Sequence, residues 1–186
     1  DLYVMDPRNP ASTRMVHESK GGGWALVGFS PDRQTAYVAD YLSVQNIDLY
    51  TLDLASGAMT PIGDPATEIA YGGLKVAPDG TLWVTSDFGA DFQQLGRLDP
   101  VSGVFSPVSR ETWDVDSFDL SKDGKTIAYV VNEAGTDRLR IMDVASGKVT
   151  KVDALPAGQI SRVSFAPWGE IGFSFSSARS AADVWS

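Results

Sequence analysis

Short stretches of strand-like residues, separated by residues that favour turns, run along the whole chain. In the middle they cover residues 73–77, 81–86, 94–99 and 104–108. Runs of four to six residues with partial apolar–polar alternation and many β-branched and aromatic side chains predict β-strands. No stretch repeats its apolar residues with the period of an amphipathic helix. The pattern therefore predicts an all-β protein in which successive strands pair as a meander.

The same group of four strands is predicted once before and once after these runs. The preceding group covers residues 25–30, 35–39, 48–53 and 59–62, and the following group covers 116–120, 126–131, 138–143 and 148–152. The three groups therefore predict three successive four-stranded antiparallel sheets.

Two turn motifs recur with one common period. The first is Ser-Pro-Asp-Arg at 30–33, Ala-Pro-Asp-Gly at 77–80, Ser-Lys-Asp-Gly at 121–124 and Ala-Pro-Trp-Gly at 166–169, and its third positions are 47, 44 and 45 residues apart. The second begins at Asp53, Asp99 and Asp143, each followed three and four residues later by Ser-Gly, and residues 6–10 form a degenerate earlier copy. Proline presets φ for a turn, and glycine tolerates a positive φ. Four short strands every 44 to 47 residues are typical of a β-propeller blade.

The repeat predicts one partial β-propeller over residues 1–186 with about four blades of four-stranded antiparallel sheet. The predicted boundaries are 1–23 (half a blade), 24–69, 70–114, 115–159 and 160–186 (half a blade). Residues 1–4 and 183–186 match the same third-strand position, so we expect a piece of a larger propeller of seven or eight blades. Two alternatives stay open. The N-terminal strands could pair with 162–166 and 170–174 to close a four-bladed ring, or two copies could form an eight-bladed ring. Without closure, the outer apolar sheet faces would favour self-association.

An aromatic residue recurs in the second strand of each repeat, four to six residues after the turn. These residues are Tyr37, Trp83, Tyr129 and Phe173. A blade has two apolar faces that it cannot bury alone, so we expect these rings to pack between neighbouring sheets.

Composition narrows the classes of partner. The net charge of −9 and the absence of a Lys/Arg stripe exclude a nucleic-acid partner. The longest apolar runs fall far short of the roughly 20 residues that cross a bilayer, so no membrane partner is expected. The chain has no cysteine, which excludes disulfides and thiolate chemistry but fits either the cytoplasm or the periplasm.

The residues that would carry catalysis are absent. A Ser–His–Asp triad needs a histidine, and the one histidine, His17, lies in the polar stretch 16–23, where we predict a surface loop. No Gly-x-Ser-x-Gly elbow occurs, because the nearest sequence, 28–32, departs from it at the last position. Asp114, Asp116 and Asp119 offer oxygen ligands for calcium, but solvated strand edges are the favoured interpretation. We therefore expect no catalytic residue, no cofactor and no metal.

The longer connections between predicted strands point to one end of the blades. Second-to-third connections at 40–47, 87–93, 132–137 and 176–182, and fourth-to-first connections at 63–72 and 109–115, share one rim of a propeller. Binding residues concentrate on long loops that a rigid scaffold holds. The candidate binding residues on this rim are Tyr41, Phe88, Phe92, Trp113 and Arg179.

The repeat resembles two known families. The sequence from Phe29-Ser30-Pro31-Asp32 to Ser56-Gly57 resembles the propellers of TolB-type proteins and of prolyl-oligopeptidase-like serine peptidases. The stretches 85–95 and 173–180, the latter followed by 183–185, favour the peptidases. WD-repeat proteins are a poorer match, because the one Trp-Asp pair, at 113–114, precedes a first strand.

The peptidase resemblance implies a filter. In that family the propeller covers the active site of an α/β-hydrolase domain and restricts access to small peptides. The implied partners are that hydrolase domain or further blades, and a peptide substrate. Dipeptidyl-peptidase members also hold the substrate's amino terminus with a Glu pair, and this chain has no adjacent Glu-Glu. The alternative is an independent TolB-like propeller that binds protein partners.

Overall fold

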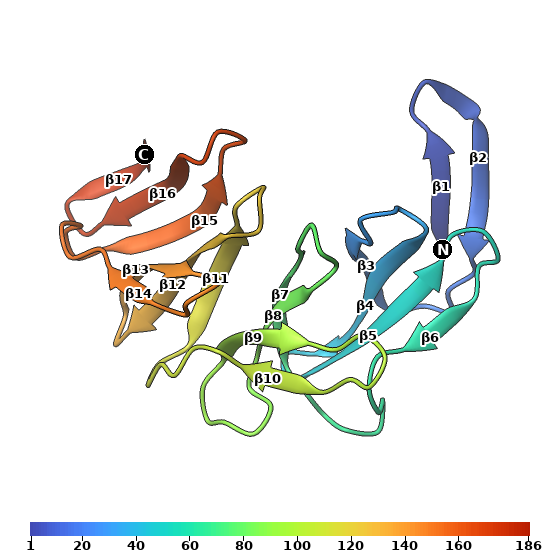
Figure 1. Ribbon diagram of the computed structural model, residues 1–186, viewed down its shortest axis with the longest axis horizontal. Helices are drawn as coiled ribbons and strands as arrows, with labels where there is room; N and C mark the ends of the chain where they lie inside the picture. Colours follow the sequence, from blue (N-terminus) through green and yellow to red (C-terminus); the bar gives the residue numbers. More distant parts are fainter. The chain divides into compact units, whose positions relative to one another are not determined.

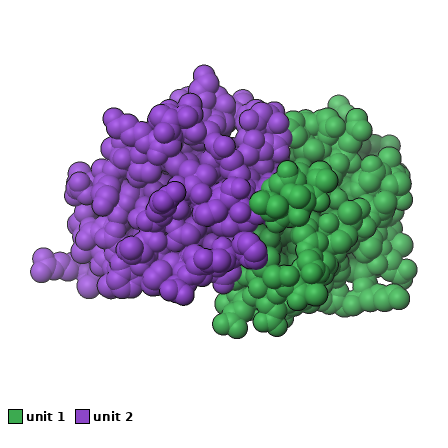
Figure 2. All heavy atoms as spheres, turned by 60° about the horizontal axis from the view of Figure 1, so that its bottom comes forward, with its two compact units in different colours: residues 1–71, 99–104 green, residues 72–98, 105–186 purple.

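The computed structural model describes residues 1–186 and consists of β-strands with no helix. The chain divides into two compact units (Figure 2). Unit 1 comprises Asp1–Tyr71 with Asp99–Val104, and unit 2 comprises Gly72–Leu98 with Phe105–Ser186. None of the elements is a helix with the length and apolarity needed to cross a lipid bilayer.

Two sheets belong to unit 1 (Figure 1). Their strands are β1 (Leu2–Asp6), β2 (Asn9–His17), β3 (Gly23–Phe29), β4 (Thr35–Ser43), β5 (Asn46–Asp53) and β6 (Met59–Pro61). β1 and β2 form a two-stranded antiparallel sheet, and β3 to β6 form a four-stranded sheet in sequence order. The first predicted four-strand group is confirmed.

Three further sheets follow along the chain. Their strands are β7 (Tyr71–Val76), β8 (Leu82–Ser86), β9 (Gln94–Leu98), β10 (Phe105–Pro107), β11 (Val115–Leu120), β12 (Thr126–Glu133), β13 (Thr136–Asp143), β14 (Val149–Lys151), β15 (Gln159–Phe165), β16 (Ile171–Ser177) and β17 (Ser180–Trp185). β7–β10 and β11–β14 are four-stranded, β15–β17 is three-stranded, and each keeps the order of the chain. The predicted meander topology is confirmed for all three four-strand groups.

The first turn motif has one backbone geometry in all four copies. The N–H of its fourth residue donates to the carbonyl oxygen of its first residue at 2.8–2.9 Å, as from Gly80 to Ala77 and from Gly169 to Ala166. The fourth residue has a positive φ in every copy: 89° at Gly80, 73° at Gly124, 97° at Gly169 and 58° at Arg33. Glycine adopts this region without steric cost, which explains its place in three of the four copies.

Aspartate side chains complete both turn motifs. In the first motif, Asp79 Oδ1 accepts a hydrogen bond from the N–H of Thr81 at 2.9 Å, and Asp32 and Asp123 do the same two residues on. In the second, the carboxylates of Asp53, Asp99 and Asp143 accept the N–H of the serine three residues later at 2.7–2.8 Å. These bonds replace hydrogen bonds that the turn backbone would otherwise need from water.

The turn carboxylates predict an acid-sensitive fold. Hydrogen bonds from Ser56 and Ser146 lower the pKa of Asp53 and Asp143, and backbone hydrogen bonds from Ser102 and Val101 lower that of Asp99. A pKa lower in the folded state than in the unfolded chain stabilises the fold above about pH 4, and that stability is lost as the pH falls through the folded pKa. We expect the midpoint temperature of thermal unfolding to decrease as the pH is lowered below about 4. The triple variant Asp53→Asn/Asp99→Asn/Asp143→Asn should show a flatter drop, whereas the control Asp153→Asn, at an exposed aspartate, should not. An equally steep acid transition in the triple variant would contradict this assignment.

Apolar side chains fill the space between neighbouring sheets. In unit 1, the buried Ala36, Val38 and Leu52 of the four-stranded sheet pack with Leu2 and Val16 of the β1–β2 sheet. In unit 2, one cluster joins β7–β10 to β11–β14 and a second joins β11–β14 to β15–β17. The sheets therefore stack face to face through separate cores.

Strand β12 shows why stacking is needed. Ile127, Tyr129 and Val131 belong to the first unit 2 cluster, whereas Ala128 and Val130 belong to the second. Because successive side chains of a strand point to opposite faces, both faces of this sheet are apolar and covered. Trp83, Tyr129 and Phe173 lie in these clusters and Tyr37 is also buried, so the prediction that the recurring aromatics pack in the interior is confirmed.

Two sequence predictions of loops are wrong. The connections at 40–47, 132–137 and 176–182 were predicted to be long, but strands extend through them and leave two-residue turns between Ser43 and Asn46, Glu133 and Thr136, and Ser177 and Ser180. His17 was predicted in a surface loop, but it ends β2 and its ring packs on Trp24, with 5.9 Å between ring centroids. Cross-strand pairing and an aromatic contact stabilise extended backbone where the polar composition suggested a loop.

Candidate functional site

An aromatic edge forms where the one long second-to-third connection of unit 2 meets the segment before β11. We define the aromatic edge as Phe88, Phe92 and Trp113. Phe88 and Trp113 are 50% and 41% exposed. The rings of Phe92 and Trp113 contact each other, with centroids 6.0 Å apart. The edge therefore presents rings to solvent while two of them support one another.

The buried side chain of Gln94, at the start of β9, holds the two segments of this edge together. Its Nε2 donates to the carbonyl oxygen of Glu111 at 3.0 Å, and its Oε1 accepts the N–H of Glu111 at 2.9 Å and the hydroxyl of Ser109 at 3.0 Å. Ser109 Oγ in turn accepts the N–H of Leu95 at 2.8 Å. One amide thus satisfies both backbone groups of Glu111, which fixes the segment leading to Trp113.

A second link lies at the other end of the same segment. Asp114 Oδ1 accepts the N–H of Gln93 at 2.8 Å, and the N–H of Val115 donates to the carbonyl oxygen of Gln93 at 2.9 Å. The loop carrying Phe88 and Phe92 and the segment carrying Trp113 are therefore joined on both sides of the aromatic edge.

A buried charge network lies behind the edge. Arg140 in β13 is 3% exposed, and its guanidinium pairs with Glu133, while its Nε lies 4.0 Å from Glu111 Oε1. The hydroxyl of Tyr129 donates to the same Glu111 oxygen at 2.8 Å. Burial, followed by the hydrogen bond to Glu111, raises the pKa of Tyr129 above its ordinary value, so the phenol keeps its proton and remains a donor. Glu111 is thus fixed by its backbone and by its carboxylate.

A cavity of about 460 Å³ opens beside the aromatic edge. Its lining includes Asp91, Phe92, Gln94, Arg110, Glu111 and Thr112. An aromatic wall with a carboxylate and a guanidinium at the rim can accept one or two residues of a peptide through packing and hydrogen bonds. The cavity lining contains no histidine, cysteine or lysine.

The structure separates the five candidate residues into three places. Phe92 and Trp113 are in contact, and Phe88 shares with them only the connection that carries Phe92, four residues earlier. Tyr41 lies within β4 of unit 1, paired with Ile47 and Gly23. Arg179 occupies the two-residue turn between β16 and β17. The role of all five in binding stays a prediction.

The calcium interpretation does not gather its residues into one site. Asp119 Oδ1 pairs with Lys75 Nζ at 2.8 Å, and its Oδ2 accepts the N–H of Phe165 at 2.7 Å. Asp114 is bonded to Gln93, and burial, followed by the charges of Asp137 and Asp114, raises the pKa of Asp116. Asp119 therefore links β7, β11 and β15, a structural role that the sequence did not reveal.

The residues that brace the site were missed at the sequence level. Gln94, Glu111 and Arg140 are separated by 17 and 29 residues in the chain, and no local motif connects them. The one signal in the sequence was the pair Arg138 and Arg140 inside the predicted strand 138–143. Alternate side chains of a strand can be buried, and a buried arginine needs an acidic partner, so the strand indicated a buried ion pair without showing its partner.

Comparison with solved structures shows which fold these stacked sheets form. A puromycin hydrolase mutant (S511A, complexed with PGG) matches with a TM-score of 0.77 and 19% identity over 94% of this chain. TolB from Acinetobacter baumannii matches with a TM-score of 0.68 and 23% identity over 93% of this chain. A structure from a study of two prolyl endopeptidases matches with a TM-score of 0.77 and 16% identity over 94%. The fold is that of a β-propeller.

The prediction of a β-propeller fold is therefore confirmed, and the predicted blade boundaries stay a prediction. The chain spans 28% of the puromycin hydrolase, 45% of TolB and 26% of the prolyl endopeptidase. No family model matches the propeller sequence, and a search of curated proteins gives no match.

Proposed function

We propose that this propeller is a non-catalytic segment that restricts the access of peptides to the active site of a prolyl-oligopeptidase-like serine peptidase. The observation that carries the proposal is the braced aromatic edge of Phe88, Phe92 and Trp113. The fold likeness to a puromycin hydrolase and a prolyl endopeptidase supports it. The lack of a histidine among the residues of the edge and its cavity supports a role in binding and exclusion.

A filter needs walls that keep their position when a peptide presses against them. The hydrogen bonds of Gln94 and Asp114 hold the loop and segment that carry the three rings. Aromatic side chains add large contact areas and lose little conformational entropy on binding, because they have two χ angles. A fixed edge of this kind would exclude bulky chains and admit an extended peptide that packs on the rings.

The proposal includes partners. They are an α/β-hydrolase domain or further blades, and a peptide substrate of that domain. Apolar sheet faces that remain uncovered would also promote self-association.

The proposal predicts a change of length selectivity in the peptidase that contains this propeller. Phe88→Ala/Phe92→Ala/Trp113→Ala should raise kcat/KM for long peptides by several fold relative to short peptides, because the steric wall is removed. Gln94→Ala should shift selectivity in the same direction by loosening the edge. The measurement is kcat/KM for a series of fluorogenic peptides of increasing length.

The matched control is Phe29→Ala, which removes an exposed ring in β3, outside the aromatic edge. It should leave the length profile unchanged. Unchanged selectivity in the triple variant would overturn the filter. Peptide hydrolysis by the isolated propeller would overturn its non-catalytic role.

A second candidate is a TolB-like propeller that binds a protein partner. This chain covers 45% of the length of TolB from Acinetobacter baumannii, at 23% identity, which is a larger part than it covers of the other two proteins compared above. An exposed aromatic edge also suits a protein interface. If the complete protein hydrolyses no peptide and the triple variant loses a protein partner, this candidate is supported.

A further inference from the structure

One copy of the first turn motif departs from the others in a single side chain. Its third residue is aspartate in three turns and Trp168 in the fourth. The backbone hydrogen bond and the positive φ are the same in all four copies. Trp168 therefore replaces an aspartate that would cap the turn, although the backbone has not changed to require it.

The indole of Trp168 contributes little to the core. It is 78% exposed, the highest value among the aromatic side chains and the third highest among all large apolar ones. Its Nε1 donates to Glu170 Oε2 at 2.9 Å, a bond that lowers the pKa of Glu170 and so keeps that acceptor charged. The ring is thus held in place with its N–H satisfied, and only its apolar face is available to another molecule.

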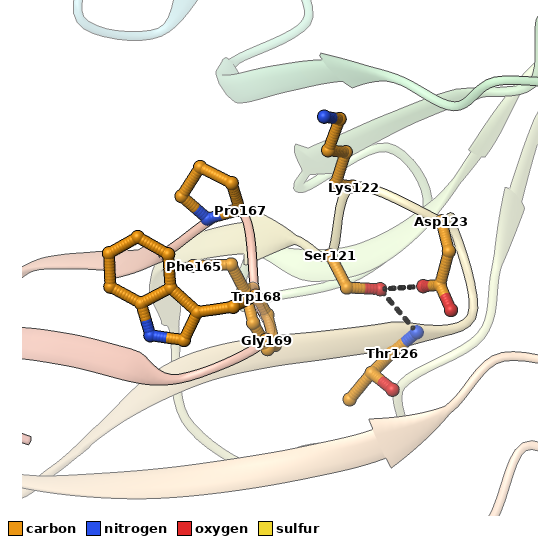
Figure 3. Close-up of a pocket in the computed structure, with 8 residues that line it drawn as sticks. All are labelled: Ser121, Lys122, Asp123, Thr126, Phe165, Pro167, Trp168 and Gly169. Carbon is orange, nitrogen blue, oxygen red and sulfur yellow. Dashed lines mark hydrogen bonds between the residues drawn. The ribbon is translucent and has the colours of Figure 1, made fainter.

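A cavity of about 500 Å³ lies between this turn and the neighbouring turn of unit 2 (Figure 3). Its lining comprises Ser121, Lys122, Asp123 and Thr126 on one side and Phe165, Pro167, Trp168 and Gly169 on the other. Phe165 also packs against the core between β11–β14 and β15–β17, so this wall is anchored. The volume lies within the range of cavities that take small ligands or a few residues of a peptide.

The polar side chains of the cavity differ in whether they are available to bind a ligand. Asp123 Oδ1 accepts the hydroxyl of Ser121 at 2.7 Å and the N–H of Lys125 at 3.1 Å, and its Oδ2 lies 4.0 Å from Lys125 Nζ, so both oxygens of this carboxylate have partners within its own turn. Lys122 is exposed and has no hydrogen-bond or ion-pair partner in the protein. The cavity therefore offers a ligand one free cation and one aromatic face, and Lys122 disfavours a cationic ligand.

We propose that this cavity binds an extended, proline-containing peptide segment that carries an acidic side chain. Polyproline segments dock on aromatic surfaces at low entropic cost, because their conformation is preformed. A proline ring would lie on the face of Trp168 beside Pro167, and a carboxylate would pair with Lys122. In a meander, first-to-second turns lie at the opposite end of the strands from second-to-third connections, so this cavity is distinct from the aromatic edge.

The test uses the fluorescein-labelled hexapeptide Glu-Pro-Pro-Glu-Pro-Pro and fluorescence anisotropy. We expect saturable binding with a Kd on the order of 100 µM that weakens as salt is added. Trp168→Asp should weaken binding at least about tenfold, and Lys122→Ala about threefold. The charge-reversed peptide Lys-Pro-Pro-Lys-Pro-Pro should bind at least about tenfold more weakly than the acidic one.

Trp168→Asp is also a control for folding. It restores the sequence Ala-Pro-Asp-Gly of residues 77–80, in which Asp79 caps the turn, so its thermal midpoint should equal or exceed that of the parent. Lys151→Ala, at an exposed lysine of β14 outside the cavity, should bind the peptide normally. Absence of saturable binding, equal binding by the Trp168→Asp variant, or binding of a maltooligosaccharide in place of the peptide would overturn the proposal.

Discussion

Arg140→Ala is expected to lower the free energy of unfolding by about 3 kcal/mol, at the lower end of the range for breaking a buried ion pair. The guanidinium is 3% exposed and lies between Glu111 and Glu133. Its removal leaves the Glu111 carboxylate, which accepts the Tyr129 hydroxyl, without a cation, and it leaves Glu133 with Arg138 alone, at 3.6 Å. The loss stays at the lower end because both glutamates keep some contact with solvent.

Two further variants separate the buried charge from simple loss of contacts. Arg138→Ala removes an arginine whose side chain is 40% exposed and whose Nε lies 3.6 Å from Glu133 Oε2, and it should cost less than about 1 kcal/mol. Arg140→Met/Glu111→Gln/Glu133→Gln removes the charges together and should recover much of the loss. Urea denaturation measures all three. An Arg140→Ala variant as stable as Arg138→Ala would show that the network carries no stability.

Trp83→Ala is expected to cost about 4 kcal/mol, because truncation of a buried tryptophan loses its burial and leaves a cavity. Trp83 is 1% exposed, packs in the cluster between β7–β10 and β11–β14, and lies 4.9 Å beneath the Arg97 guanidinium. The chain has only about 5–15 kcal/mol of stability to lose, if it is typical of domains of this size. The variant should therefore be partly unfolded near 37 °C.

The matched control is Trp168→Ala, which deletes the same side chain at an exposed position and should change stability by less than about 1 kcal/mol. Trp83→Phe should fall between the two, since a smaller ring leaves a smaller cavity. Denaturant midpoints followed by circular dichroism provide the comparison. Equal losses for Trp83→Ala and Trp168→Ala would contradict the assignment of Trp83 to the core.

Local chemistry made the repeat predictable from sequence. The turns at 77–80 and 121–124 depend on a capping aspartate and a glycine at a positive φ, and both requirements are visible in four residues. Two motifs with one period then set the number and order of strands. The pairing of strands within each sheet follows, because consecutive strands in a meander have no other neighbour available.

The hairpins at the other end of the strands were harder to predict. Residues 132–137 read as a polar loop, yet Ala134 and Gly135 adopt φ values of 52° and 85° and close a two-residue turn. Two consecutive positive φ values match a type I′ turn, which Asn-Gly usually signals and Ala-Gly does not. Pairing along the full length of β12 and β13 therefore decides the conformation, and that pairing is not a local property of the sequence.

The candidate site was predictable only in its exposed part. Phe88, Phe92 and Trp113 stood out as aromatic residues in polar connections, and the structure places Phe92 against Trp113. Gln94 and Arg140, which brace them, are an ordinary strand glutamine and arginine in the sequence. Their roles depend on contacts with Glu111, which is 17 residues from Gln94 and 29 residues from Arg140 in the sequence. A single sequence does not reveal contacts between residues so far apart in the chain.

The constant backbone of the first turn motif has a consequence for how such a protein can evolve. Arg33 stands where glycine is usual, and Trp168 stands where aspartate is usual, without a change in the turn's hydrogen bond. Mutation can thus install a new recognition group on one blade while the other copies retain their original sequence. A propeller whose turns keep one backbone conformation with different side chains can acquire binding residues one repeat at a time. The same tolerance makes the four turns, at residues 30–33, 77–80, 121–124 and 166–169, suitable sites for a combinatorial binding library.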